Sequence, residues 1–258
     1  KQQKNILDSI QYAHRIQNAF FVPQSEIKEH FPESFVLFKP KDIVSGDFYW
    51  LQAKDEKIYF AAADCTGHGV RGALVSIICQ DLLNHALNHY PKGDPGTLLA
   101  WTSQQLMESL QQRMDLKSGE FGVKDGMDIS LCCFDPKNKT LSFSGAHAPL
   151  YLIRDGKLLI TKGNNNYMGR VMKDEIFQTH TFDLQHGDRI YLFSDGYADQ
   201  KGGPENKKFY YPPFQKLLVD NHKRPMHEQK EILENTLKTW QGNNGQVDDI
   251  LVFGLQFI

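Results

Sequence analysis

The chain has 258 residues, enough for one large domain with a buried core, and nothing in its composition requires two domains. Its formal net charge is -2 and it contains no basic tract, which argues against a nucleic-acid footprint and against a polybasic membrane patch. No apolar run approaches the roughly 20 residues of a membrane span, and no signal peptide opens the sequence. We therefore predict a cytoplasmic domain that binds no nucleic acid and makes no direct membrane contact.

The four cysteines also favour a location in the cytoplasm. Cys65, Cys79, Cys132 and Cys133 lie mostly in apolar stretches, with no C-x-x-C pair and no Cys/His zinc spacing, so we expect reduced core residues. The sequence begins with Lys1 and not with Met. We therefore expect a longer protein with a sensor domain, or a membrane anchor, upstream.

The first predicted element is a helix over residues 4–21, where an apolar stripe faces away from polar side chains and Pro23 ends the pattern. The stripe consists of Ile6, Ile10, Ala13, Ile16 or Gln17, and Phe20. A stripe without a core of its own is typical of a connector or a dimer contact, although the helix could equally pack on the domain that follows. We assign residues 1–30 to a connector or regulatory helix and 31–258 to the main domain.

After residue 33 the pattern changes to short β-rich runs separated by two blocks of helices. Strands are predicted at 34–40, 43–54, 57–64, 127–135, 140–147, 149–160, 175–184, 189–195 and 250–258. Helices are predicted at 70–89, 98–110, 214–221 and 226–240, and loops at 117–126, 163–173 and 202–213. Consecutive strands with tight turns favour an antiparallel α+β sandwich over a parallel α/β fold.

Acidic residues recur at the edges of these apolar runs. Asp64 ends the run from Ile58 and is followed by Gly67-His68-Gly69 and a helix. The same pattern occurs at Asp47 in VSGDFYW, at Asp195 in IYLFSDGYAD and at Asp248-Asp249 in QVDDILVFGLQF. A single Asp beside Gly most often forms an Asx turn or caps a helix. Four such positions, far apart in sequence, predict convergence on one pocket.

Five motifs together carry a family resemblance. VSGDFYW, AADCTGHGVRGAL, GAHAPLYLIRDG, LFSDGYADQKG and VDDILVFGL, in this order, resemble the bacterial SpoIIE-like (sporulation stage II E) branch of the metal-dependent protein phosphatase 2C superfamily, over about residues 34–258. The resemblance implies a sandwich of two antiparallel β-sheets flanked by helices on both sides, with a two-metal site at one end between the sheets.

The resemblance also implies the ligands of two Mg²⁺ or Mn²⁺ ions. Asp64 would bridge both ions, Asp47 and the backbone carbonyl of Cys65 would serve one, and Asp195 with Asp248 would serve the other. These hard cations prefer oxygen ligands, which suits a shell of Asp residues. Two ions about 3.5–4 Å apart clamp the phosphoryl oxygens and create a bridging hydroxide nucleophile near neutral pH.

Further positions carry weaker implications. Asp249 ranks behind Asp248 as a ligand, and Asp199 matches a position that holds a third ion in relatives, with Asp125 as a candidate companion. His68 is a candidate proton donor to the leaving serine oxygen, although a structural role in its turn is favoured. In the eukaryotic relatives Gly-His-Gly follows the bridging Asp directly, whereas Cys65-Thr66 intervene here.

Trp50, His147 and Arg71 lie in or beside these motifs but are not predicted to be ligands. The family often has an acidic residue where this chain has Trp50, so a supporting role at that position is missing. His147 in GAHAPL is expected to pack and hydrogen-bond and not to catalyse. Arg71 lies one turn into the helix beside the site and could meet substrate phosphate, although a solvated Arg is the commoner outcome.

The resulting prediction is a metal-dependent protein serine/threonine phosphatase. Its substrate would be a phosphorylated bacterial signalling protein, and the usual partner in this branch is an anti-sigma-factor antagonist of the STAS type. The alternative is a catalytically inactive module that keeps the fold and signals by binding. A metal-dependent phosphodiesterase or nuclease is disfavoured because a basic surface and a His-rich metal motif are absent.

Overall fold

The structure, a computed structural model, describes residues 2–110, 125–166, 168–169 and 176–257. The predicted loop at 117–126 lies outside these residues except for its last two positions, and the predicted loop at 163–173 is described only in part. None of the helices described has both the length and the apolar character needed to cross a membrane.

Two five-stranded sheets form the centre of the molecule, and all pairings between their strands are antiparallel. Sheet A has the order β1-β12-β9-β6-β7, with strands Ser34–Lys39, Ile250–Gln256, Arg189–Phe193, Leu150–Arg154 and Lys157–Thr161. Sheet B has the order β2-β3-β4-β5-β8, with strands Asp47–Lys54, Lys57–Cys65, Met127–Asp135, Thr140–Ala146 and His180–Asp183. A separate hairpin pairs β10 (Lys201–Gly202) with β11 (Lys207–Lys208).

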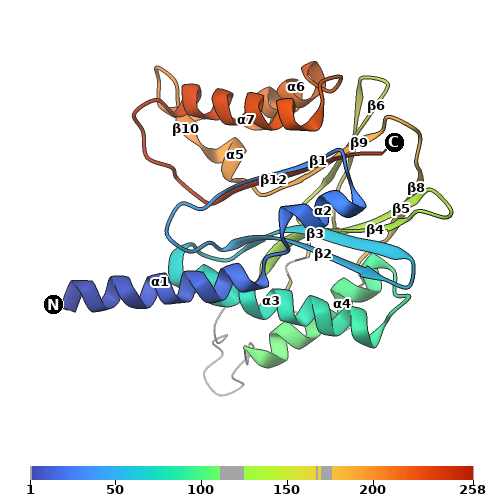
Figure 1. Ribbon diagram of the computed structural model, residues 1–258, viewed down its shortest axis with the longest axis horizontal. Coiled ribbons are helices and arrows are strands. Elements are labelled where there is room, and N and C mark those ends of the chain that lie inside the picture. Colours follow the sequence, from blue (N-terminus) through green and yellow to red (C-terminus); the bar gives the residue numbers. More distant parts are fainter. Residues whose placement is uncertain (1, 111–124, 167, 170–175, 258) are drawn as a thin grey trace.

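Helices cover both outer faces of this sandwich, as Figure 1 shows. Helices α3 (Gly69–His89) and α4 (Pro95–Ser109) lie on sheet B, whereas α6 (Tyr211–Asp220) and α7 (Met226–Gln241) lie on sheet A. The remaining helices are α1 (Gln2–Phe20), α2 (Gln24–His30) and the short α5 (Gly196–Asp199). The predicted α+β sandwich with helices on both sides is confirmed. Helix α1 extends away from the sheets, with the N-terminus at its far end (Figure 1).

Burial on both faces explains the apolar run that leads to Asp64. In β3, Tyr59 and Ala61 pack in the cluster that joins sheet B to α3 and α4, while Phe60 and Ala62 pack in the cluster between the two sheets. A strand covered by helices on one side and by a sheet on the other has no solvent face to carry polar residues. Its sequence is therefore almost continuously apolar until the strand ends.

The structure differs from the predicted elements in several places. Helices α2 and α5 and the β10–β11 hairpin were not predicted, and α2 is short and buries Ile27 between the sheets. The strand predicted at 43–54 begins only at Asp47, and α6 begins at Tyr211 inside the loop predicted at 202–213. Of the strand predicted at 175–184, residues 176–179 are not in a strand, because β8 begins only at His180. The preceding Phe177 packs with the helix side of sheet B, and the Gln178 N–H donates to the Asn164 side chain and not to a neighbouring strand.

Candidate active site

Three aspartates stand side by side at one end of sheet B. Asp47 pairs with Asp64 across β2 and β3, and Asp64 pairs with Asp128 across β3 and β4. Directly paired residues of neighbouring strands point to the same face of a sheet. Because Asp64 shares the alternation of Phe60 and Ala62, all three carboxylates face the layer between the two sheets.

Sheet A supplies Asp195 and Asp248 at the same end of the sandwich. Asp195 follows β9 after Ser194, and Asp248 comes two residues before β12, which is paired with β9. The two sheets are joined here by a direct contact, since the Ser194 hydroxyl donates to Oδ2 of Asp47 and accepts from the Leu251 N–H at 3.0 Å. Segments about 150 residues apart in the chain thus meet at one point.

The carboxylates repel one another. Burial, followed by the charge on Asp64, raises the pKa of Asp47 well above its usual range, while the Ser194 hydroxyl acts in the opposite direction. Burial and then the charges on Asp195, Asp248 and Asp128 raise the pKa of Asp64. Burial, with the charges on Asp199 and Asp248, raises the pKa of Asp195 to about 6. Each of these carboxylates is therefore costly to ionise where it stands.

This charge pattern fits a cation site. In the described part of the chain, positive charge opposes the raised pKa only partly: Lys208 acts on Asp195 and His147 acts on Asp128. A divalent ion would offset the repulsion and prefers the carboxylate oxygens present here. Among the described residues, however, no three His, Cys, Asp or Glu side chains have the spacing of a ready-made metal site. The assignment of Asp47, Asp64, Cys65, Asp195 and Asp248 as ligands stays a prediction.

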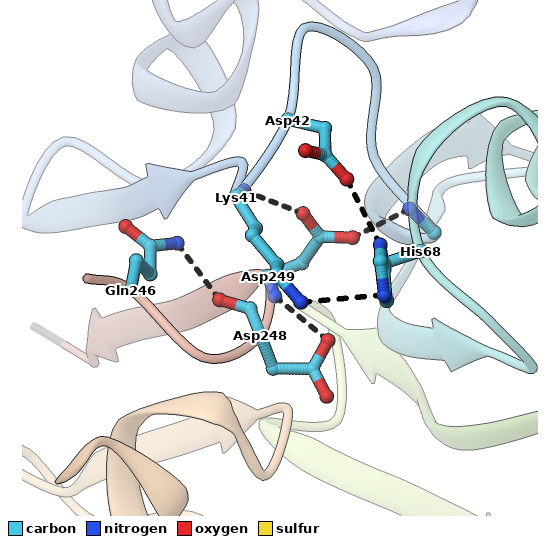
Figure 2. Close-up of polar contacts among 7 residues, drawn as sticks. Lys41, Asp42, His68, Gln246, Asp248 and Asp249 are labelled. Atoms are coloured by element: carbon cyan, nitrogen blue, oxygen red, sulfur yellow. Dashed lines mark hydrogen bonds and ion pairs between the residues drawn. The ribbon is translucent and has the colours of Figure 1, made fainter.

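Asp249 has a structural task that differs from that of its neighbour. Its two carboxylate oxygens accept the backbone N–H groups of Lys41 and Gly46, each at 2.7 Å (Figure 2). The Asp249 carboxylate therefore holds together both ends of the loop between β1 and β2, immediately before Asp47. Asp248 accepts the backbone N–H of Asp249 through one oxygen at 2.9 Å. The lower rank given to Asp249 as a ligand agrees with these contacts.

His68 contacts this loop from the turn that follows β3. It precedes the first residue of α3, and its Nδ1 lies 2.9 Å from Oδ2 of Asp42, while its Nε2 lies 3.2 Å from Nζ of Lys41. Figure 2 shows the imidazole between these two side chains. Both ring nitrogens are therefore engaged in holding the start of α3 against the loop. The geometry favours the structural role of His68, and its role in proton transfer stays a prediction.

The two candidates for a third ion are held by cations. Asp199 accepts a hydrogen bond from Nζ of Lys208 at 2.7 Å. Asp125 is buried and accepts a short hydrogen bond from Arg71, whose side chain is largely exposed. Arg71 thus binds a carboxylate of its own chain. The side chain of Lys208 is 45% exposed, so its pair with Asp199 lies at the surface.

The other residues singled out in the sequence have packing roles. Nε1 of the buried Trp50 donates to Asn84 of α3 at 2.8 Å. His147 has a positive φ of 57° and its Nε2 lies 2.6 Å from the Asn165 carbonyl. The backbone N–H of Cys65 donates to the Gly46 carbonyl at 3.3 Å, which ties the turn after Asp64 to the residue before Asp47.

Several residues of this region escaped the sequence prediction. Asp128 shows the same signal as the others, an acid beside Gly126 at the edge of an apolar run, and could have been included. Ser194 and Gln17 carried no such signal, because their importance comes from contacts with distant segments. Tyr211 lies near Asp195 and Asp199, and burial together with their charges raises its pKa.

Comparisons with known proteins agree with this architecture. The profile of the family described as Stage II sporulation protein E (SpoIIE) matches residues 54–258. The SiaA-PP2C domain of Pseudomonas aeruginosa superposes with a TM-score of 0.89 and 32% identity, over 100% of this chain and 99% of that one. Comparison with curated protein sequences found no match.

Two more distant structures share the fold. The PP2C phosphatase domain of SpoIIE from Bacillus subtilis, solved with a fragment of its regulatory domain, has a TM-score of 0.68 and 16% identity, over 87% of this chain and 63% of that one. The serine/threonine phosphatase PstP/Ppp of Mycobacterium tuberculosis has a TM-score of 0.56 and 16% identity, over 87% and 97%. Together with the profile match and the SiaA domain, the acid-lined end of the sandwich leads to one conclusion: this chain belongs to the SpoIIE family of PP2C-type phosphatase domains.

Proposed function

We propose that the domain is an active Mg²⁺- or Mn²⁺-dependent protein serine/threonine phosphatase that hydrolyses phosphoserine or phosphothreonine on a bacterial signalling partner. The observation that carries this proposal is the cluster of Asp47, Asp64, Asp128 and Asp195 at one end of the sandwich. Burial raises the pKa of all four carboxylates, and repulsion by neighbouring aspartates adds to the rise for Asp47, Asp64 and Asp195. Burying several acids at one place destabilises the folded protein unless a cation binds there.

The residues would divide the work as follows. Asp64 would serve both ions, Asp47 and the Cys65 carbonyl would serve one, and Asp195 with Asp248 would serve the other. Bound ions would neutralise charge on the phosphoryl oxygens and lower the pKa of a bound water to near neutrality. A third ion would bind at Asp199 after Lys208 turns away.

The protein's own part is positioning. Ser194 donates a hydrogen bond to Asp47 from the opposite sheet. The Asp249 carboxylate binds both ends of the loop that precedes Asp47. The Ser194–Asp47 and Asp249–Gly46 contacts are buried and the Asp249–Lys41 contact is half-buried, so they position the carboxylate without help from substrate. Pre-set ligands cost no reorganisation during the reaction, which is a major source of rate in phosphoryl transfer. His68 contributes by keeping the start of α3 against the same loop.

The test is hydrolysis of p-nitrophenyl phosphate by the purified chain with Mn²⁺ or Mg²⁺, before and after chelation. We expect activity that disappears with chelator and returns with metal. If no hydrolysis occurs and calorimetry detects no Mn²⁺ binding, the alternative of an inactive interaction module is supported instead. Phosphoproteomic comparison of cells carrying the wild type or Asp195→Asn would then identify the substrate.

We place this activity in the cytoplasm and assign it a phosphorylated protein substrate, with a STAS-type anti-sigma-factor antagonist as the partner implied by the family resemblance. The four cysteines are free and buried, which suits a reducing compartment. A STAS-type protein phosphorylated on serine is the direct test substrate, and failure to release its phosphate under conditions that support p-nitrophenyl phosphate hydrolysis would reject this partner.

We further propose that residues 1–30 transmit a signal from an upstream sensor domain to the active site, through Gln17. This side chain on α1 is 1% exposed. Its Nε2 donates to the Ser45 carbonyl at 2.6 Å and to the Ser76 hydroxyl of α3 at 2.9 Å, and its Oε1 accepts the Ser45 N–H at 3.1 Å. The Ser45 hydroxyl in turn accepts the N–H of Asp47 at 3.0 Å. A movement of α1 therefore acts on the backbone next to a predicted ligand.

Replacing Gln17 with Ala is expected to lower metal-dependent activity about tenfold. The variant leaves the buried Ser45 peptide without its partners, which costs on the order of 1–3 kcal/mol, and lets Asp47 shift. Initial rates and the Mn²⁺ concentration for half-maximal activity measure the effect. Gln11→Ala, at an exposed position of the same helix, is the matched control. Equal activity in both variants would remove Gln17 from the signalling route.

Helix α1 also offers a contact for a second copy of the chain. Its exposed apolar side chains are Ile6, Leu7, Tyr12, Ile16 and Phe20. We expect the full chain to sediment as a dimer and the double variant Ile6→Glu/Ile16→Glu to sediment as a monomer, because a buried unpaired charge opposes helix pairing. Gln11→Glu adds charge at an exposed polar position and should leave the mass unchanged. A monomeric wild type would contradict the proposal.

A further inference from the structure

Tyr210 has a backbone conformation that tyrosine rarely adopts. Its φ is 69° and its ψ is 158°, a region populated almost only by glycine. Holding a residue with a Cβ there costs on the order of 1–3 kcal/mol. Burial of the ring does not offset this conformational strain, because Tyr210 is 53% exposed. A side chain kept at such a position, where glycine would be favoured, indicates that the side chain itself is used.

The conformation is held by the segment that carries the acids. The Tyr210 N–H donates to the Ala198 carbonyl of α5 at 2.7 Å, and the Phe209 N–H donates to the Gln200 carbonyl at 3.0 Å. The ring of Phe209 is buried against Trp240, with centroids 5.5 Å apart. Since α5 joins Asp195 to Asp199, Tyr210 is fixed relative to both carboxylates.

Two neighbours extend this feature toward the acid cluster. Tyr211 begins α6, is 40% exposed, and its ring lies 6.2 Å from that of Phe193, two residues before Asp195. Because Phe193 leads through Ser194 to Asp195, the Tyr211 ring lies beside the segment that carries this carboxylate. Lys208 pairs with Asp199 at 2.7 Å and precedes Tyr210 by two residues. Lys208, Tyr210 and Tyr211 thus form one rim of the acid cluster, which we call the tyrosine rim.

We propose that the tyrosine rim binds the polypeptide on either side of the phosphoserine, and so selects which phosphoproteins are hydrolysed. This inference rests on the proposed phosphatase function. Tyrosine suits the task because it offers a large apolar surface with a polar tip and loses little conformational entropy on binding. The charge of Lys208 is already paired with Asp199, so its contribution to the rim is the aliphatic part of its side chain. A substrate without flanking polypeptide does not need this surface.

The test uses Tyr210→Gly, which keeps the backbone conformation, relieves its strain and removes the side chain. The small probe is p-nitrophenyl phosphate. The extended probe is a pool of phosphoserine proteins extracted from the bacterial source, with the rate at each site followed by mass spectrometry. We expect the variant to hydrolyse the extended probe about tenfold more slowly, to keep its rate on the small probe within twofold, and to unfold at the same or a higher temperature.

The control is Asn206→Gly, an exposed residue of the β10–β11 connection that also has a positive φ, of 50°. It should leave both rates unchanged. Equal losses on both probes, or no loss on the extended probe, would overturn the docking role while leaving the phosphatase function intact. A shift of Tyr210→Gly from dimer to monomer would assign the rim to a second copy of the chain and equally overturn it. If the wild type hydrolyses neither probe, the proposed function fails, and this inference fails with it.

Discussion

Replacing Asp64 with Asn is expected to reduce Mn²⁺-dependent hydrolysis of p-nitrophenyl phosphate by about 100-fold or more. In the proposed function Asp64 would contact both ions, so its loss would remove several kcal/mol of charge stabilisation. Each roughly 1.4 kcal/mol corresponds to a tenfold change in rate. Asn keeps the size of the side chain and one of its oxygens but carries no charge. Steady-state rates over a range of Mn²⁺ concentrations measure the effect.

A stability measurement separates this loss from misfolding. Burial and the charges on neighbouring aspartates raise the pKa of Asp64, so the folded state binds more protons than the unfolded state between the ordinary pKa of Asp and the raised one. The contribution of this carboxylate to the free energy of unfolding therefore decreases as the pH rises through that window. At pH 7.5 and without metal, we expect Asp64→Asn to be at least as stable as the wild type.

The matched control is Asp155→Asn, an exposed residue in the turn between β6 and β7 with a φ of 50° that Asn also tolerates. Its activity should equal that of the wild type. If Asp64→Asn retained the wild-type rate at saturating Mn²⁺, a role for Asp64 in ion binding would be excluded. The proposed function would then need a different set of ligands.

Replacing Gly72 with Ala is expected to lower activity by about 100-fold and to destabilise the protein. A Cβ on this residue of α3 would lie 2.1 Å from the carbonyl oxygen of Gly67 and 2.9 Å from Cα of Gly46, distances that require the backbone to move. Gly67 belongs to the turn after Asp64, and Gly46 precedes Asp47. A displacement of about 1 Å at reacting groups can cost two orders of magnitude in rate.

The direction of this effect opposes helix propensity. Gly→Ala inside a helix normally stabilises by roughly 1 kcal/mol, whereas overpacking here should cost about 1–3 kcal/mol. Chemical denaturation measures the difference, and activity assays below the unfolding transition measure the loss of rate. The control is Gly245→Ala, where an added Cβ meets nothing within 4 Å. Unchanged activity in Gly72→Ala would show that the contact among the three glycines does not position the aspartates.

Local patterns were enough to predict the fold class and the acidic positions, because both follow from neighbours in sequence. The alternation of buried strands, the turns between them and the two blocks of helices predicted the sandwich. The positions of Asp47, Asp64 and Asp195 at strand ends predicted that they form one group, because the ends of neighbouring strands lie together at one end of a sheet. The failure at residues 176–179 has a local cause as well: Phe177 is apolar and strand-like but packs in the cluster that joins sheet B to α3 and α4.

Other roles depend on contacts that no local pattern contains. Asp249 and Asp248 are adjacent and chemically identical, yet the Asp249 carboxylate reaches backbone 208 and 203 residues away. Gln17 reads as one polar residue on an amphipathic helix until its hydrogen bonds to Ser45 and Ser76 are seen.

The amino-acid sequence alone thus specified which residue types lie at the strand ends and that the chain builds two antiparallel layers, because alternation and turn chemistry act over a few residues. Only the packing of sheets and helices decided that Asp64 faces the layer between the sheets and that Asp249 binds the loop before Asp47. The same packing decided that Tyr210 carries backbone strain. Those outcomes depend on strand register and on contacts between distant segments, and a one-residue change in register would turn each side chain to the opposite face.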